Sequence, residues 1–219
     1  MSASPASASL ESSLLSPPIS SELWQRHWDG PPLRLGVLAS GSGSNFEAIA
    51  QAIAKKELNA EICGLIYNNP QAKAAERADR LGISKVLLNH REFPSRETLD
   101  GAIAQTFYDQ GVDWVIMAGW MRIVTQVLID AFPGRLLNIH PSLLPSFKGA
   151  HAIEQALASG ARITGCTVHL VSLEVDSGPI LVQAAVPILP GDTVETLHQR
   201  IQAQEHRIYP LGIAIAAAS

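Results

Sequence analysis

An asparagine and a histidine two residues apart are the first candidates for chemistry in this sequence. Asn138 and His140 end a short apolar run, and Pro141, which cannot donate to a sheet ladder, follows at once. Side chains two apart on a strand project from one face, so the amide and the imidazole would point together from the strand's carboxyl end. The pair could serve a reacting carbonyl, because Asn offers neutral hydrogen bonds and His titrates near neutral pH. A polar strand end capped by its own loop is the alternative.

A second candidate is the glycine-rich segment 39–45, which reads A-S-G-S-G-S-N between an expected strand and an expected helix. Glycines let the backbone approach a ligand closely, and the free N–H groups and positive dipole end of a helix N-terminus suit a phosphate. A dinucleotide site fits less well, because Phe46 replaces the third Gly of G-x-G-x-x-G and residues 67–69 (Y-N-N) lack the acid that holds a ribose. No Lys-Ser/Thr pair completes a Walker motif, and a plain tight turn stays open as an alternative.

Two further loops carry side chains that could line a ligand site. Residues 119–124 (G-W-M-R-I-V) are mostly apolar with one positive charge, which suits a flat ligand with acceptor edges. Residues 173–179 (L-E-V-D-S-G-P) place Asp176 in a connection where its carboxylate could orient His140. The alternatives are a core-packing connection for the first loop and an ordinary turn residue for Asp176.

The elements that must position these residues alternate between strands and helices from Leu33 onward. Strands are expected at Leu33–Ala39, Ala60–Tyr67, Lys85–Leu88, Trp114–Ala118 and Leu136–His140, with helices at Asn45–Lys56, Ala72–Leu81, Arg96–Gln110 and Ala152–Ser159. This order predicts an α/β, Rossmann-like fold with a mostly parallel sheet and helices on both faces. Ligands bind beyond the carboxyl ends of the strands in such a sheet, so the candidate loops should converge on one cleft.

The last part of the chain should add antiparallel strands and a final helix. Residues 163–171 and 179–186 are too close in sequence for a crossover helix, so they should pair antiparallel. Asp192 and Glu195 predict a capping box for a helix that runs to about Tyr209, where Pro210 interrupts it.

Residues 1–30 differ in composition from the rest of the chain. Ser, Ala and Pro dominate this segment, which predicts a disordered leader ahead of a single domain at 31–219. Trp24 and Trp28 are spaced for one helical face and could instead dock on the domain.

The overall composition narrows the class of ligand. The chain has 219 residues, 47% of them apolar, with a net charge of -4, so it lacks the basic face that nucleic acid or an anionic membrane would need. No apolar run approaches the ~20 residues that span a bilayer. Cys63 and Cys166 lack metal-site spacing and are expected to be buried, reduced thiols. These features predict a soluble, cytoplasmic protein with small-molecule ligands and no metal.

Five motifs together resemble one enzyme family. They are N-I-H-P-S-L-L-P at 138–145, D-S-G-P-I at 176–180, G-S-G-S-N at 41–45, G-W-M-R-I at 119–123 and Q-A-Q-E-H at 202–206. Over about residues 33–210 they resemble the phosphoribosylglycinamide formyltransferases of purine biosynthesis. The first two motifs are shared by all folate-dependent formyltransferases, whereas G-S-G-S-N and Q-x-Q-E-H are typical of the glycinamide ribonucleotide enzymes.

The resemblance implies a reaction and a set of site residues. The formyl group of 10-formyltetrahydrofolate would pass to the amine of 5-phosphoribosylglycinamide without a metal, in a monomer or homodimer. Asn138, His140 and Asp176 match the catalytic trio. The ribonucleotide would be held by Gly43, Ser44, Asn45, Phe46, Glu47, Gln202, Ala203, Gln204 and Glu205. The folate would be held by Arg96, Met121, Arg122, Ile123, Val124, Asn138, Ser172, Leu173, Glu174, Val175 and Asp176.

Three other functions are compatible with parts of this pattern. A methionyl-tRNA formyltransferase should carry a basic tRNA-binding module, and a formyltetrahydrofolate deformylase should lack the phosphate loop. A catalytically silent ligand sensor on the same scaffold should have a broken trio. The intact trio and the glycine-rich loop favour the ribonucleotide enzyme.

Overall fold

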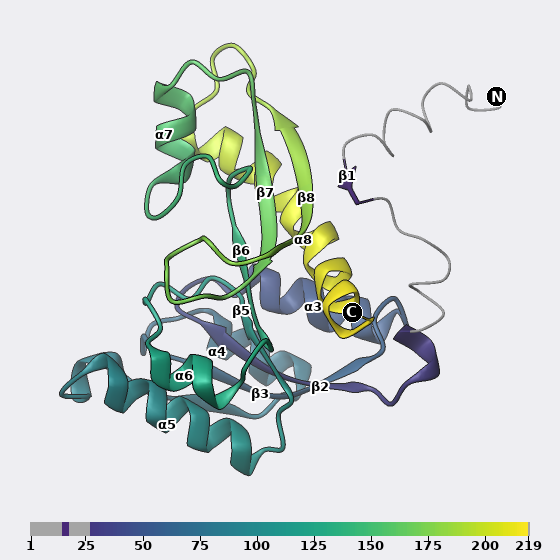
Figure 1. The fold of residues 1–219 in the computed structure, drawn as a ribbon, viewed down its shortest axis with the longest axis vertical. Helices are drawn as coiled ribbons and strands as arrows, with labels where there is room; N and C mark the ends of the chain where they lie inside the picture. Colours follow the sequence, from purple (N-terminus) through teal and green to yellow (C-terminus); the bar gives the residue numbers. More distant parts are fainter. Residues whose placement is uncertain (1–14, 18–26, 219) are drawn as a thin grey trace.

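A central sheet of eight strands organises the computed structural model, which describes residues 15–17 and 27–218 (Figure 1). The strands are β1 (Leu15–Ser16), β2 (Leu33–Ala39), β3 (Ala60–Tyr67), β4 (Lys85–Leu87), β5 (Trp114–Met117), β6 (Leu136–His140), β7 (Ile163–Leu170) and β8 (Ile180–Pro187). Their order is β1-β8-β7-β6-β5-β2-β3-β4. Strands β2 to β6 run parallel, and β7, β8 and β1 are antiparallel additions. The predicted α/β fold is therefore confirmed.

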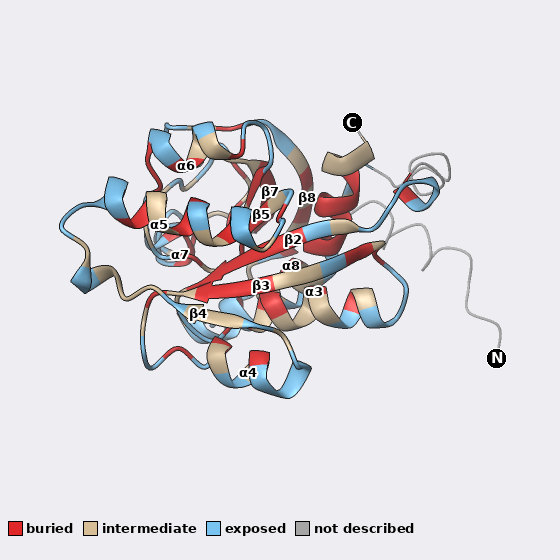
Figure 2. Ribbon diagram, turned by 90° about the horizontal axis from the view of Figure 1, so that it is seen from below, coloured by how far each residue is buried: buried red, intermediate tan, exposed pale blue. Residues whose placement is uncertain are grey.

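Helices cover both faces of this sheet (Figure 2). One face carries α3 (Ser44–Ala54), α4 (Ala74–Leu81), α7 (Ala152–Ala158) and α8 (Val194–Ala218), and the other carries α5 (Arg96–Asp109) and α6 (Gln126–Ala131). The alternation within β2 shows why two cores form. Leu35 and Val37 pack into the first core, and Leu38 into the second, because successive side chains of a strand point to opposite faces. A strand covered on both sides can be apolar throughout, as β2 is after Arg34.

The predicted start of α5 and the predicted end of α4 are both confirmed, and each is stabilised by the residue that was expected there. Ser95 begins α5 with a capping box, in which its side chain accepts from the Thr98 N–H at 3.2 Å. Gly82 ends α4 with φ 66°, a left-handed conformation that glycine adopts without a steric penalty. Helix α6 and the 3₁₀ turn η1 (His90–Glu92) were not expected from the sequence.

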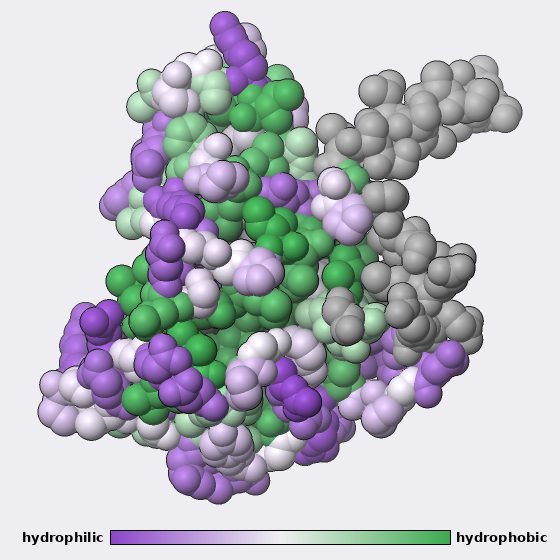
Figure 3. Space-filling view, viewed as in Figure 1, coloured by the Kyte–Doolittle hydropathy of each residue, from purple (hydrophilic) through white to green (hydrophobic). Residues whose placement is uncertain are grey.

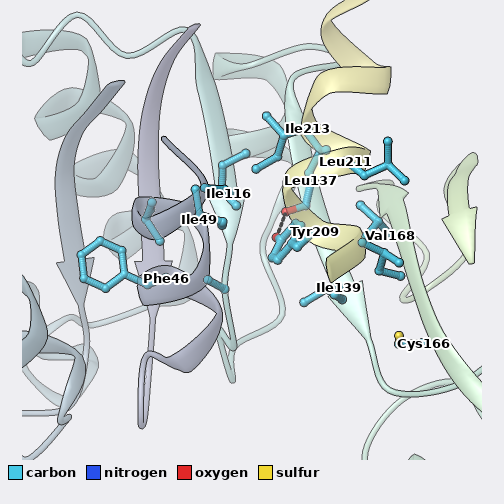
Figure 4. Close-up of a cluster of buried hydrophobic side chains, with 14 of the residues drawn as sticks. Phe46, Ile49, Ile116, Leu137, Ile139, Cys166, Val168, Tyr209, Leu211 and Ile213 are labelled. Atoms are coloured by element: carbon cyan, nitrogen blue, oxygen red, sulfur yellow. Dashed lines mark hydrogen bonds between the residues drawn. The ribbon is translucent and has the colours of Figure 1, made fainter. Parts of the chain in front are cut away.

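The predicted end of the last helix at Tyr209 is wrong, because α8 continues through Pro210 to Ala218. A proline inside a helix costs about 3 kcal/mol. The half of α8 around it is buried against the sheet, including Leu211 and Ile213, and each such side chain contributes about 1.5–3 kcal/mol. The Tyr209 hydroxyl also donates to the Met117 carbonyl at 3.0 Å. It shares its proton with the Leu137 carbonyl at 3.2 Å (Figure 4). Burial therefore outweighs the break that proline favours.

The predicted capping box at the start of α8 is also wrong in its residues. Thr193 and Thr196 form the reciprocal bonds, at 2.9 Å and 3.3 Å, instead of Asp192 and Glu195. Asp192 is held by Arg200, whose Nη1 lies 2.7 Å from its carboxylate. Hydrogen bonds from Arg200 and from the Leu189 N–H keep the pKa of Asp192 far below its usual value.

Part of the segment expected to be a disordered leader lies against the domain. Leu15 and Ser16 pair with β8 at Ala184 and Gln183. Buried His27 accepts from the Asn59 N–H at 2.8 Å, while Asn59 Nδ2 donates to the His27 carbonyl at 3.2 Å and to the Gly30 carbonyl at 3.0 Å. These residues therefore contact the domain, and the disorder of the leader as a whole stays a prediction. Trp24 and the remainder of 1–26 lie outside the described residues, and the domain limit at 31 stays a prediction.

Candidate active site

A cleft of about 390 Å³ opens at the carboxyl ends of β5 and β6. Its lining combines the loop after β5, the end of β6, the start of α7 and the loop after β7. Apolar residues gather across the middle of this face, between α6 and α7 (Figure 3). Met121 is 79% exposed and Leu173 is 60% exposed, and both line the cleft. Large apolar side chains left open to water in a cleft are typical of a ligand-binding wall.

The loops after β2 and β5 are bonded to each other next to this cleft. The Ser40 N–H donates to the Gly119 carbonyl at 3.0 Å, and the Met121 N–H donates to Ser40 Oγ at 2.8 Å. Strands β2 and β5 are neighbours from which the chain proceeds outward in opposite directions. Such a switch point is where open α/β sheets bind ligands. The glycine-rich loop and the cleft are therefore parts of one continuous edge.

Asn138, His140 and Asp176 meet in the cleft. Asp176 Oδ2 lies 3.3 Å from His140 Nδ1, and Asp176 Oδ1 lies 3.5 Å from Asn138 Nδ2. Strand β6 supplies the first two residues, and the loop after β7 supplies Asp176. The proximity expected from the sequence is present, and the catalytic roles stay predictions.

Each ring nitrogen of His140 faces an acceptor. Nδ1 faces the Asp176 carboxylate, and Nε2 lies 2.8 Å from the carbonyl oxygen of Phe147. A carboxylate and a carbonyl only accept hydrogen bonds, so both contacts are satisfied when each ring nitrogen carries a proton. Both ring nitrogens are therefore placed beside hydrogen-bond acceptors. The Nε2–H that now reaches Phe147 is the donor that a substrate oxygen could take over.

His169 belongs to the same cluster and was missed from the sequence. Its Nε2 lies 3.2 Å from Asn138 Nδ2 and 3.6 Å from Asp176 Oδ1, while its Nδ1 lies 2.8 Å from the Leu170 carbonyl oxygen. The antiparallel register of β6 and β7 places it directly opposite Asn138. The two strands were recognised, but only their register, which the sequence does not encode locally, brings the histidine into the site.

The environment of Asp176 favours its charged form. Burial by itself would raise the pKa of this carboxyl. The nearby His169 ring, the Gly149 N–H, which donates at 2.8 Å, and the His140 ring together outweigh burial, so the pKa lies below its ordinary value. Asp176 therefore stays ionised near neutral pH and can orient His140.

Backbone strain gathers around this cluster. Phe147, His151 and Asp176 have positive φ angles of 54°, 63° and 51°, and among the described non-glycine residues only Lys56 shares this feature. Such conformations cost of order 1–3 kcal/mol each and persist where surrounding contacts determine them. Their concentration beside His140 supports a functional site.

The cleft contains most of the residues expected to hold a folate. Those that line it are Met121, Arg122, Ile123, Val124, Asn138, Ser172, Leu173, Val175 and Asp176. Two residues expected to hold the folate do not line the cleft. Arg96 is exposed at the first position of α5, and Glu174 points to Lys148 at 3.4 Å. Arg122 Nε is buried without a partner among the described residues, so the wall still has a donor to offer.

The segments expected to hold the ribonucleotide also come together, although they are some 160 residues apart. Gln202 Nε2 donates to Ser44 Oγ at 3.0 Å, and Asn45 Nδ2 donates to Glu205 Oε2 at 2.9 Å. We call this junction of α3 and α8 the helix-end site, defined by Gly43, Ser44, Asn45, Gln202 and Glu205. Asn45 Oδ1 is buried there without a partner among the described residues.

The N-terminus of α3 is open to an acceptor. Gly43 is its N-cap and provides no side-chain cap, and the first helical amide with an acceptor is Glu47 N–H, which donates to the Gly43 carbonyl at 3.0 Å. The N–H groups before it have no intrahelical acceptor, as at any helix start, and they present the positive end of the dipole. This geometry suits the phosphate that the sequence predicted.

Gly43 itself is required by packing. Its φ is +72°, and a Cβ there would lie 2.7 Å from Ala74 Cβ on α4. Two other members of the predicted segment also have structural contacts: Phe46 is fully buried in the core, and Glu47 pairs with Arg77 and Arg80 of α4. These two side chains are engaged within the domain, and the prediction that residues 43–47 hold the ribonucleotide rests on the backbone amides at the start of α3.

On α8, Ala203 is exposed and Gln204 accepts from Arg207 at 3.1 Å, so neither faces α3 through the bonds described. Glu205 is 6% exposed, and burial raises its pKa above the ordinary value, with only partial compensation from Asn45. A buried carboxyl with so few partners is expensive unless a ligand completes its hydrogen bonds.

Two surveys of the described residues bear on other classes of site. Among residues 15–17 and 27–218, no group of three or more His, Cys, Asp or Glu side chains is arranged to hold a metal ion. Within the same ranges, no helix has the length and apolar character needed to cross a membrane.

Comparison with known proteins gives consistent results. A family model described as formyl transferase matches residues 33–213. The chain is 44% identical over 196 residues to the trifunctional purine biosynthetic protein adenosine-3 of Drosophila pseudoobscura pseudoobscura, covering 89% of this chain but 14% of that protein. Phosphoribosylglycinamide formyltransferase of Escherichia coli (strain K12) is 40% identical over 182 residues, which cover 83% of this chain and 86% of the relative.

A solved structure shows the same likeness. Glycinamide ribonucleotide transformylase 1 from Symbiobacterium toebii superposes with a TM-score of 0.82 at 47% identity, over 83% of this chain and 86% of that one. The chain spans less than a fifth of the length of the trifunctional relatives it matches and most of the length of the single-function ones.

Proposed function

Because the chain belongs to the formyl transferase family, we propose that it transfers the formyl group of 10-formyltetrahydrofolate to the amine of 5-phosphoribosylglycinamide, a step of purine biosynthesis. The observation that carries this proposal is the continuity of two sites along one sheet edge. The loop that leads into the helix-end site is bonded through Ser40 to the loop that walls the cleft. A phosphorylated amine and a formyl donor bound at these sites would meet beside His140.

The cleft fits the formyl donor. Its wall is mostly apolar, with exposed Met121 on the loop after β5 and exposed Leu173 on the loop after β7. Arg122 Nε, which has no partner among the described residues, can donate a hydrogen bond to an acceptor group of the ligand. 10-Formyltetrahydrofolate carries its formyl group as an amide, and the carbonyl of that amide is the reacting group. In the transfer, a bond forms between the attacking amine nitrogen and the formyl carbon, the bond to the departing nitrogen breaks, and one proton passes between the two nitrogens.

The residues of the cleft would stabilise the negative charge that develops during this reaction. As negative charge develops on the formyl oxygen, His140 can turn its Nε2–H from the Phe147 carbonyl to that oxygen, and Asn138 can donate beside it. Ionised Asp176 holds the imidazole in its donating form and is placed to assist the proton transfer. The amine is itself the nucleophile, so no activated Ser or Cys is needed.

The helix-end site would hold the acceptor. The open amides of α3 suit its phosphate, and Glu205 and Asn45 Oδ1 can accept from ribose hydroxyls. This site favours a phosphorylated ribose over methionyl-tRNA or water as the formyl acceptor. We place the reaction in the cytoplasm, where the free thiols of Cys63 and Cys166 would stay reduced.

The test is an acceptor-exchange assay with 10-formyltetrahydrofolate. Purified protein is mixed with 5-phosphoribosylglycinamide, with methionyl-tRNA or with no acceptor, while the absorbance of the deformylated folate is followed. We expect turnover with the ribonucleotide alone and a formylated product of the expected mass. Equal folate consumption without an acceptor would identify a deformylase and refute the proposal, and turnover with methionyl-tRNA alone would do the same. His140→Ala serves as the inactive control.

A further inference from the structure

Helix α5 holds α6 at both ends through polar contacts that the proposed chemistry does not use. At the start of α6, Asp100 Oδ2 accepts from the Thr125 N–H at 2.5 Å. At its end, the Tyr108 hydroxyl donates to the Ala131 carbonyl at 2.5 Å, and the Tyr108 ring stacks on Phe132 at 5.1 Å. Asp100 and Tyr108 are eight residues apart, about two helical turns, so they lie on one face of α5.

Asp100 is an unusual group to find at this contact. It is 2% exposed, and burial raises the pKa of its carboxyl, with the bonds to Thr125 opposing that shift. Burying a carboxyl is costly, and an apolar residue would fill the same place without that cost. Leu99 and Ile103 on the same helix are buried apolar side chains, and the charges that act on Asp100 are those of Glu97 and Arg96 on α5. The carboxyl is therefore explained by what its hydrogen bond positions.

The segment that it positions is the wall of the cleft. Thr125 directly follows residues 120–124, all of which line the cleft. The other end of this segment is tied to Ser40 through the Met121 N–H at 2.8 Å. Within residues 120–124, Trp120 Nε1 and Arg122 Nε are buried without partners among the described residues. The wall is thus held at its two ends by backbone hydrogen bonds.

Apolar packing alone would fix the position of residues 120–124 less precisely than a hydrogen bond does. Trp120 and Val124 share a core with Leu99 and Ile103, but apolar contact is non-directional, whereas a hydrogen bond fixes distance and angle. We propose that Asp100 is a positioning residue for the formyl-donor wall of the cleft, acting through its bond to the Thr125 N–H. This inference rests on the proposed function, because it assumes that the wall binds the donor.

The test compares two substitutions of Asp100 with a control at the other end of α6. Asp100→Ala removes the acceptor and should raise the KM for 10-formyltetrahydrofolate about tenfold, while kcat and the KM for the ribonucleotide stay within about twofold. Asp100→Asn keeps a carbonyl acceptor of the same shape and should restore the KM to within about threefold. Tyr108→Phe breaks the far contact and should lower the melting temperature while leaving the KM unchanged.

Several results would overturn the inference. These are an unchanged donor KM in Asp100→Ala, an equal rise in both KM values, an Asp100→Asn variant as impaired as Asp100→Ala, or a Tyr108→Phe variant that also loses donor affinity. Amide hydrogen exchange of the wild-type protein gives a test that does not depend on the variants folding: the Thr125 amide should exchange slowly, and fast exchange would refute the contact.

A binding measurement separates this inference from the proposed function. Binding of tetrahydrofolate is measured by titration calorimetry for the wild-type protein and for Asp100→Ala. A wild-type protein that does not bind would contradict the proposed function. A wild-type protein and variant that bind equally well would contradict only the role of Asp100.

Discussion

Asp176 and Glu205 are both largely buried carboxyl groups, yet their pKa values move in opposite directions. Asp176 lies beside the His169 and His140 rings and accepts from the Gly149 N–H, and together these outweigh burial. Glu205 has Asn45 as its hydrogen-bonding partner, and burial dominates. Burial raises the pKa of both carboxyl groups, and the number of hydrogen-bond donors and positive charges near each group decides whether its net shift is upward or downward.

The two environments differ in how many of their polar groups have partners among the described residues. The cluster around Asp176 already satisfies its acceptors, which favours preorganised stabilisation of developing charge. The helix-end site keeps a buried carboxyl, an Asn45 Oδ1 without a partner in the described part of the chain, and the open amides of α3. We infer that the first site contributes mainly to the rate and the second mainly to binding.

The largest expected effect comes from removing donors at the cleft. His140→Ala and Asn138→Ala should each lower kcat by about 10² to 10⁴, because their bonds strengthen only as charge develops on the formyl oxygen. Ribonucleotide affinity, measured by titration calorimetry, should stay within about twofold. Gln199→Ala, an exposed residue on α8, is the control and should leave both unchanged. A loss of ribonucleotide affinity equal to the loss of rate would contradict the division between the sites.

Asp176→Asn should lower kcat by about 10² or more, because the imidazole loses the charged partner that holds it as a donor. The depressed pKa also makes Asp176 a source of stability. That contribution is present above the unfolded value of about 3.9 and is lost as the pH falls through the lower folded value. The stability gap between wild type and variant should therefore shrink below about pH 4 in urea melts. A gap that widens in acid would show that Asp176 is not stabilised as an anion.

Glu205→Gln should show the opposite sign for stability. The raised pKa means that the folded protein prefers the protonated carboxyl, so the ionised form costs stability once the pH exceeds the unfolded value of about 4.3. The amide mimics the protonated form and should raise the melting temperature at pH 7, with no gain below about pH 4. Ribonucleotide binding should weaken by about 1.5–3 kcal/mol while folate binding is unchanged. Unchanged ribonucleotide affinity would remove Glu205 from the site.

The smallest effect is expected from the N-terminal segment. Deleting residues 1–30 removes the β1–β8 pairing and the bonds between His27 and Asn59, and should lower the melting temperature by about 2–4 °C, the shift of about 1 kcal/mol in a domain of this size. The composition of the segment predicted no change. His27→Ala should reproduce part of the loss, and kcat should be unaffected in both variants. A deletion without any thermal effect would restore the prediction from composition.

Local patterns in the sequence were enough to identify the parallel strands, most helices and the loops that carry chemistry. Apolar runs broken by Gly, Pro and Asn are short-range signals, and so are the Ser95 cap and the Gly82 helix end. The rule that ligands bind beyond the strand ends then placed Asn138 and His140 beside the glycine-rich loop. The loop after the late strand offered Asp176 as a carboxylate that could orient His140, and motif resemblance then assigned it to the trio.

Contacts between distant segments were decided only by the tertiary structure. The register of β6 against β7 put His169 opposite Asn138, and burial on the sheet carried α8 past Pro210. The bond from Asp100 to Thr125 and the contact of Asn45 with Glu205 likewise join separate elements. Local patterns report the period of an element and the chemistry of its ends. The partners of a side chain depend on how whole elements pack, and that is settled by burial summed over the complete fold.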